Sequence, residues 1–261
     1  MKPFLLATTA TALFLAGQAH AEPRYSWTGC YVGGHLGAGW GKSDISERLE
    51  PIAQVFAPLD SPIGLHSGTG FLGGAQLGCD HQFFNNWLIG GAADFSWANI
   101  EGRAVDPFFT GKSGGPILLN SKTDWLATTT ARVGYAWDRW MFYGKGGAAW
   151  THDKVQLQNL TFGNSPGGLV VCSAGGPPIA CNPAGSKTIN GWTLGFGLEW
   201  MLANNWSAAI EFDHYDFGTH QLNLSDPHGG AAPATSAINL KQRTEAVKLS
   251  LSYRFGWTGR P

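Results

Sequence analysis

The chain has 261 residues, with 17 Lys and Arg against 18 Asp and Glu and a formal net charge of −1. Charged residues make up 13% of the sequence, about half of their share in ordinary soluble domains. A chain without a basic field is not expected to bind nucleic acid through phosphate contacts. The 37 glycines show no Gly-X-Y period, which excludes a collagen, and an aromatic content of 13% excludes a disordered chain.

The first 21 residues, MKPFLLATTATALFLAGQAHA, have the organisation of a secretory signal peptide. Lys2 precedes an apolar stretch, and Ala19-His20-Ala21 has the small-x-small form that signal peptidase accepts. A membrane anchor is the alternative, but the apolar stretch is too short to span a bilayer and a cleavage site follows it. We therefore expect a signal peptide over residues 1–21 and a single mature domain over residues 22–261.

The mature chain shows apolar residues with a period of two, which indicates β-strands. In the last such segment, for example, Leu249 and Leu251 alternate with Lys248 and Ser250. The segments with this pattern are residues 28–41, 69–83, 87–98, 125–137, 141–151, 189–201, 206–216 and 244–255. Each has roughly ten or more residues, the length that a tilted strand needs to cross a bilayer.

The connections between these eight segments alternate in length. Three are tight turns at residues 84–86, 138–140 and 202–205, and four are long connections at about 42–68, 99–124, 152–188 and 217–243. Barrels of the outer membrane alternate in this way, with short turns in the periplasm and long loops outside. The sequence therefore predicts an all-β fold: an eight-stranded antiparallel up-and-down transmembrane β-barrel with four long outer loops and three short periplasmic turns.

The twelve tryptophans lie at or near the ends of the predicted strands. Trp87 and Trp97 are ten residues apart, which is ~33 Å of strand, or ~25 Å across the membrane after a ~40° tilt. That distance matches the apolar band between the two aromatic girdles of a membrane barrel. A soluble sandwich or a lipocalin-like barrel would instead place most of the indoles in one core, with too few charges for a soluble surface.

Several blocks of the sequence resemble a known family. WTGCYVGGHLGAGW, TTTARVGYAWDRWMFYGKGGAAW, GWTLGFGLEWMLANNWSAAIEFDHYDFG and VKLSLSYRFG are similar, in this order, to the eight-stranded outer-membrane β-barrel surface proteins of alphaproteobacteria, often labelled "porin family". Two departures are Cys30 and Cys79, where family members usually carry an aromatic residue, and the six residues that follow Phe255.

The resemblance covers nearly the whole mature chain outside the long loops. It implies a location in the outer membrane and a largely structural or surface role. The partners that follow are outer-membrane lipid, lipopolysaccharide and, through the last strand, the barrel-assembly machinery. Some relatives are implicated in binding haemin at the cell surface.

Charged residues occur on the face that the pattern predicts to be inward. Arg132 and Lys145 are equally far from their shared turn, so we expect them at similar depth, with Asp94 and Glu211 on the flanking strands as counterions. The expected interior charge network consists of Asp94, Arg132, Lys145, Glu199, Glu211 and Lys248, with Asp80, Asp213 and Arg254 on the same face. The network is either a polar plug or a gated narrow conduit, and the small interior of an eight-stranded barrel favours the plug.

The cysteines suggest one disulfide and leave a second open. Cys172 and Cys181 lie in one long loop around Gly175-Gly176-Pro177-Pro178, and an exported chain meets an oxidising compartment, so we expect them to pair. Cys30 and Cys79 fall on adjacent strands and face lipid. They either form a cross-strand disulfide or act as two separate small apolar residues.

Histidines in the predicted outer loops are the candidates for haem binding: His66, His152, His220 and His228. None of them has metal-ligand spacing, so we expect no metal site and no bound cofactor apart from that haem alternative. A lipid-A deacylase would need His, Ser and a carboxylate together on the lipid face, but His214 has Asp216 as its same-face neighbour. No catalytic residue is predicted.

The sequence therefore predicts a non-enzymatic outer-membrane barrel that supports the integrity of the envelope and presents loops at the surface. The alternatives are uptake of haemin or another small ligand, a narrow pore, and an enzyme that modifies lipid.

Overall fold

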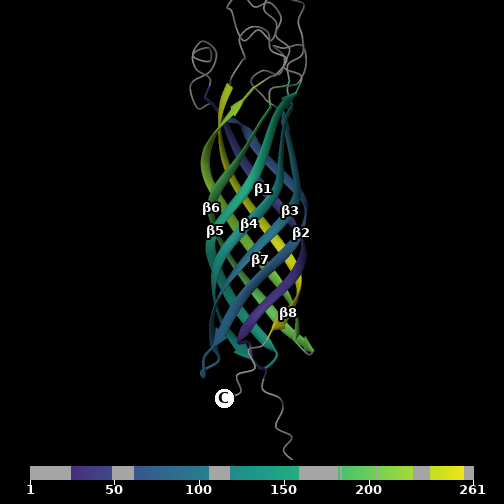
Figure 1. Cartoon of the computed structure of the whole chain (residues 1–261). Helices are drawn as coiled ribbons and strands as arrows, with labels where there is room; N and C mark the ends of the chain where they lie inside the picture. Colours follow the sequence, from purple (N-terminus) through teal and green to yellow (C-terminus); the bar gives the residue numbers. More distant parts are fainter. Residues whose placement is uncertain are drawn as a thin grey trace, which may run out of the picture.

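Eight antiparallel strands form one closed barrel in the computed structural model (Figure 1). The structure describes residues 25–48, 62–105, 118–158, 182, 184–203, 205–225 and 236–255. The strands are β1 (Gly29–Arg48), β2 (Pro62–Gln82), β3 (Trp87–Val105), β4 (Leu118–Trp137), β5 (Trp140–Gln158), β6 (Ala184–Ala203), β7 (Trp206–Leu224) and β8 (Ser236–Phe255). Each pairs with its neighbours in sequence, and β1 pairs with β8 to close the ring, so the predicted fold is confirmed.

The three predicted turns lie together at one end of the barrel, which we call the turn end; the opposite end is the loop end (Figure 1). Asn86, Asp138 and Asn205 in these turns have positive φ angles of 67°, 53° and 78°. Asn and Asp tolerate this left-handed conformation better than other residues with a side chain. Short polar turns therefore reverse the chain at the turn end.

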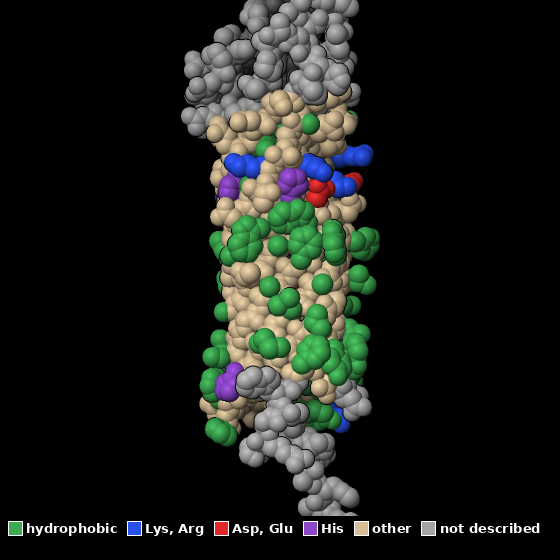
Figure 2. Space-filling model, in the orientation of Figure 1, with side chains coloured by type: hydrophobic (Ala, Val, Ile, Leu, Met, Phe, Trp, Pro, Cys, Tyr) green, Lys and Arg blue, Asp and Glu red, His purple; other side chains and the backbone are tan. Residues whose placement is uncertain are grey.

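The outer wall is apolar between two aromatic bands. Leu36, Phe71 and Leu249 are 74%, 82% and 61% exposed, values typical of side chains that face lipid rather than a protein core. Figure 2 shows large hydrophobic side chains gathered in two bands, with Lys, Arg, Asp, Glu and His beyond the band nearer the loop end. Tryptophans of the wall, from both bands, include Trp87, Trp97, Trp137, Trp140, Trp192, Trp200 and Trp206.

Trp27 does not belong to these bands. Its side chain is 0% exposed and packs inside the turn end against Leu88 and Met141. The ring Nε1 donates a hydrogen bond to the carbonyl oxygen of Asp138 at 3.3 Å. Trp27 precedes β1, so the alternation of strand residues does not determine whether its side chain points inward or outward. Its position near a strand end therefore did not place it in an aromatic girdle.

The strands are longer than the sequence pattern predicted. Each has 19 to 21 residues and extends beyond the loop-side aromatic band. The strands therefore include residues that the sequence pattern assigned to the long connections. At ~3.3 Å per residue and a ~40° tilt, a strand of this length rises ~50 Å, about twice the ~25 Å apolar band.

The polarity of the two wall faces reverses in this extension. Lys122 and Lys154 point outward, whereas Leu119, Val155 and Leu240 point inward and are buried. This arrangement is that of a barrel in water, with an apolar inside and a charged outside.

Among the described residues, the interior contains three apolar clusters. The first, at the turn end, contains Trp27, Leu88, Ala136, Met141, Tyr143 and Met201. The second contains Leu72, Ala98, Ile100, Leu126, Ala149, Ile189, Tyr215, Phe217 and Ala246. The third, in the extension, contains Leu119, Val155, Leu222, Leu224, Ile238 and Leu240. Polar layers lie between these clusters.

The expected signal peptide at residues 1–21 and the tail at residues 256–261 lie outside the described residues. No helix in the described part of the chain is long and apolar enough to cross a membrane.

Leu240 and Leu249 lie on β8 on opposite faces of the wall, 4% and 61% exposed. We expect Leu240→Ala to destabilise the protein by ~2–5 kcal/mol because it leaves a cavity in a packed cluster. Leu249→Ala should cost much less, because detergent or lipid fills the space. Thermal unfolding in detergent micelles, followed by tryptophan fluorescence, measures both. Equal losses would contradict the reversal of polarity.

Candidate functional site

Most of the buried ionisable side chains form two charged layers inside the barrel. In the layer nearer the turn end, Arg132 and Arg254 both contact Asp80 and Glu199. The Arg132 guanidinium donates two hydrogen bonds to the Asp80 carboxylate, and its Nη1 lies 3.5 Å from Glu199 Oε2. Arg254 Nη1 lies 3.0 Å from Asp80 Oδ2, and its Nη2 lies 2.8 Å from Glu199 Oε1. Two positive and two negative groups therefore neutralise one another.

The next layer contains Lys145, Lys248, Asp94, Glu211 and Asp213. Lys145 Nζ lies 2.7 Å from Glu211 Oε2 and 3.0 Å from Asp213 Oδ1. Lys248 Nζ lies 2.7 Å from Asp213 Oδ2 and 3.3 Å from Asp94 Oδ1. All five side chains are less than 9% exposed, so their charges are compensated by one another and not by water.

Most of these ion pairs skip a strand, and in two of them a glycine on the skipped strand lies directly between the partners. Asp80 on β2 and Arg132 on β4 lie on either side of Gly90 on β3. Lys145 on β5 and Asp213 on β7 lie on either side of Gly195 on β6. A Cβ on Gly90 would stand 2.1 Å from Asp80 Oδ1, and one on Gly195 would stand 2.2 Å from Asp213 Oδ1. The inward glycines therefore open windows through which charges meet.

The structure places all the charges predicted to be inward in these layers, with one different partner. Arg132 and Lys145 are direct cross-strand neighbours, and Glu211 contacts Lys145 as sequence reasoning suggested. Asp94 lies on Lys248 instead of beside Arg132. Reasoning from flanking strands missed this contact because β3 and β8 face each other across the interior.

Of the four candidate histidines, only His152 and His220 have side chains within the described set, and these two make separate contacts. The ring of His152 on β5 stacks on Trp125, and its Nδ1 is 3.1 Å from Thr188 Oγ1. His220 on β7 contacts the carbonyl oxygen of Phe217. His66 lies on β2 with its side chain outside the described set, and His228 lies wholly outside it. No three His, Cys, Asp or Glu side chains of the described residues form a metal-binding group.

Cys30 and Cys79 form a disulfide between β1 and β2. The two residues are direct cross-strand partners on the outer wall, which decides between the two alternatives that the sequence left open. The expected pair Cys172 and Cys181 lies outside the described residues.

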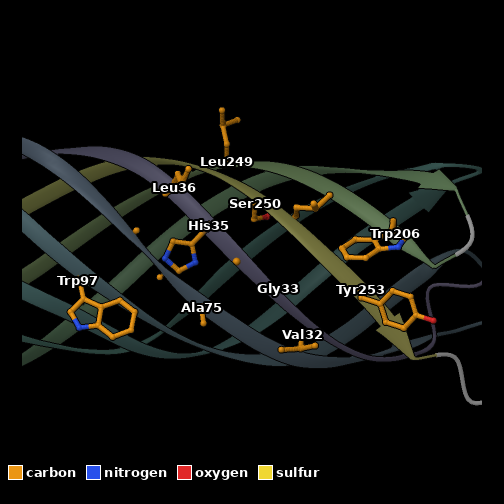
Figure 3. A pocket seen from close by; sticks show the side chains of 14 residues that line it. Val32, Gly33, His35, Leu36, Ala75, Trp97, Trp206, Leu249, Ser250 and Tyr253 are labelled. Carbon is orange, nitrogen blue, oxygen red and sulfur yellow. The ribbon is translucent and has the colours of Figure 1, made fainter.

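A shallow groove of about 900 Å³ runs along the outer wall over β1 (Figure 3). Its lining includes Val32, Leu36 and Leu249, with Trp97 towards one end and Trp206 towards the other. No Asp, Glu, Lys or Arg lines it. The groove lies within the apolar band, and its chemistry is that of a surface for acyl chains.

Sequence reasoning missed one buried acid. Asp153 is 5% exposed inside the loop-end extension of β5, within the range of about 152–188 for which the sequence pattern predicts a long connection. The signal was present as Asp153, Val155 and Leu157 at a spacing of two. The pattern was overlooked because the apolar residues of this extension lie on the inward face, whereas those of the predicted strands lie on the outward face.

The comparisons with known proteins agree with this geometry. A family model described as "Outer membrane protein beta-barrel domain" matches residues 7–255. The chain is 30% identical to the 31 kDa outer-membrane immunogenic protein of Brucella melitensis biotype 1, over 98% of this chain and 100% of that protein. It is 26% identical to the 25 kDa outer-membrane immunogenic protein of Brucella abortus biovar 1, over 89% of this chain and 81% of that protein.

Among solved structures, the outer membrane protease OmpT from Escherichia coli aligns with a TM-score of 0.51 and 9% identity, covering 87% of this chain and 97% of that chain. Identity this low shows a shared fold alone.

The glycine windows can be tested with two adjacent residues of β3. We expect Gly90→Ala to reduce the free energy of unfolding by ~1–3 kcal/mol or more and so to lower the thermal midpoint, because its Cβ collides with Asp80 and with the backbone oxygen of Cys79. Gly91→Ala is the control, since the nearest atom to its Cβ is 3.8 Å away. Unfolding in detergent micelles measures both, and similar midpoints for the two variants would contradict the role of the window.

Proposed function

Because the chain belongs to the outer membrane protein beta-barrel family, we propose that it is a non-enzymatic structural protein that supports the envelope and presents its loops at the cell surface. The protein resides in the outer membrane, and its relatives are named outer-membrane immunogenic proteins. The interior of the barrel supports the proposed structural role.

The observation that carries this proposal is the filling of the interior. Three apolar clusters lie at different depths, and compensated charged layers lie between two of them. An eight-stranded barrel has an interior just wide enough for side chains, and here those side chains pack against one another. This supports a plug rather than a conduit, so a narrow pore is the weaker alternative.

Presentation at the surface is supported by the outer face of the loop-end extension. Lys122, Lys154 and Arg243 project from it beyond the loop-side aromatic band. At that height the outer leaflet carries the headgroups of lipopolysaccharide, so we propose contact with this lipid. Alternating Leu249, Leu251 and Phe255 on the wall support recognition of β8 by the barrel-assembly machinery.

Two other parts of the proposal come from the sequence. Residues 1–21 would be removed as a signal peptide on export, leaving the domain at residues 22–261. Haemin binding has less support, because the described candidate histidines lie on separate strands. Lipid modification has less support because no catalytic residues are predicted from the sequence. The likeness to a protease is one of fold alone.

A deletion strain tests the proposal. We expect it to become sensitive to detergent and to leak periplasmic enzymes, and we expect the wild-type gene to restore the barrier. Lys248→Met should fail to restore it, because it leaves the buried Asp94 without its counterion and Asp213 with Lys145 alone, at a cost of ~3–5 kcal/mol.

Lys154→Met is the matched control. This lysine is 55% exposed and pairs with Asp124 at the surface, where an ion pair contributes ~0–1 kcal/mol. It should restore the barrier fully. An intact barrier in the deletion strain would contradict the structural role, even if the wild-type strain carries the protein in its outer membrane.

A further inference from the structure

A small, partly enclosed cavity lies inside the loop-end extension, between the second and third apolar clusters. Its volume is about 20 Å³, enough for one occupant of the size of a water molecule. Ser43 of β1, Thr123 of β4, Asp153 of β5 and Gln242 of β8 contribute polar side chains to its lining. Ile100, Val155 and Leu240 contribute apolar ones.

Only one of the two carboxylate oxygens of Asp153 accepts hydrogen bonds. Its Oδ1 accepts a hydrogen bond from Thr123 Oγ1 at 2.6 Å and another from Gln242 Nε2 at 3.0 Å. Its Oδ2 is buried and has no hydrogen-bond partner, and the same is true of Gln242 Oε1. Two buried acceptor oxygens on the lining of one cavity therefore lack a donor.

The orientation of the Gln242 amide follows from its neighbours. Its Nε2 donates to Asp153 Oδ1 and, at 3.2 Å, to Thr123 Oγ1. Rotating the amide by 180° would place the carbonyl oxygen against the carboxylate, which repels it. The bare Oε1 is thus fixed, and only a donor or a cation can satisfy it.

The carboxylate also lacks a counterion. No Lys or Arg of the described residues forms an ion pair with Asp153, in contrast to the acids of the two charged layers. Its cross-strand partner on β6, Lys187, instead donates a hydrogen bond to the carbonyl oxygen of Gln221 at 3.0 Å. His152 and Asp124 act on the pKa of Asp153 in opposite directions. A buried charge without compensation is costly, so a positive occupant of the cavity would be strongly favoured.

We propose that this cavity is a binding site for one monovalent cation of the size of sodium, with Asp153 Oδ2 and Gln242 Oε1 as its principal ligands. The hydroxyl oxygens of Ser43 and Thr123 complete a set of candidate ligands that are all oxygens, which suits a hard cation. Calcium takes six to eight oxygens and usually several carboxylates, and magnesium keeps its waters, so neither matches one carboxylate in about 20 Å³.

The bound cation would tie β5 to β8 beneath the third apolar cluster and neutralise Asp153. Protons compete for the same oxygen, because burial raises the pKa of Asp153 to about 6. An unfolded aspartate has a pKa of ~3.9, so without a cation the folded protein loses stability as pH rises from ~4 to 6. Sodium should offset this loss above pH 6 and have no effect near pH 4.5.

The experiment measures thermal unfolding of the full barrel in dodecyl maltoside at pH 7.5 and 4.5. Sodium chloride is compared with choline chloride at equal ionic strength, since choline is too large for the cavity. We expect a saturable upward shift of the midpoint by a few degrees in sodium at pH 7.5, and no shift at pH 4.5. Equal midpoints in the two salts at pH 7.5 would overturn the proposal and leave a water as the occupant.

Two variants assign the effect to the site. Asp153→Asn should lose the sodium-dependent shift, whereas Asp124→Asn, which changes a more exposed carboxylate on the outer face, should keep it. A shift that persists in Asp153→Asn would overturn the proposal. If this variant does not fold, ²³Na NMR of the wild-type protein decides: line broadening at pH 7.5 that disappears at pH 4.5 supports the site, and its absence overturns it.

Discussion

The rest of the structure depends on the narrow interior that eight closed strands leave. A membrane-spanning sheet must close so that every backbone group finds a partner, and closure at eight strands leaves room for side chains only. Between the aromatic bands, each charge that points inward must therefore find its counterion inside. The glycines at Gly90 and Gly195 meet this demand, because each removes the side chain that would separate an acid from a base two strands away.

The second constraint is the change of solvent along each strand. Between the aromatic bands the wall faces lipid, and the charges are inside; beyond the loop-side band it faces water, and the pattern reverses. Lys248 and Leu240, both on the inward face of β8, show this reversal within one strand. The cavity at Asp153 lies in the water-facing part, where a buried acid has lost the dense charge network found deeper in the barrel.

Much of the fold could be predicted from the sequence, because both the lipid-facing pattern and the short turns are local signals. The strand ends could not, since beyond Trp97 the period of two continues with opposite polarity and a search for outward apolar residues stops there. Interior partners were only partly predictable. Depth follows from distance to a turn, as for Arg132 and Lys145, but contacts across the interior, such as Asp94 with Lys248, require the closed ring.

The central claim is that the barrel is sealed by its own side chains, and electrical recording tests it most directly. The purified wild-type protein, folded in detergent and shown to be closed by its resistance to unheated dodecyl sulfate, is inserted into a planar lipid bilayer. The account predicts no discrete conductance steps in molar potassium chloride at moderate voltage. Reproducible steps that scale with the amount of inserted protein would contradict it, because ions would then pass the layers around Lys248 and Arg132.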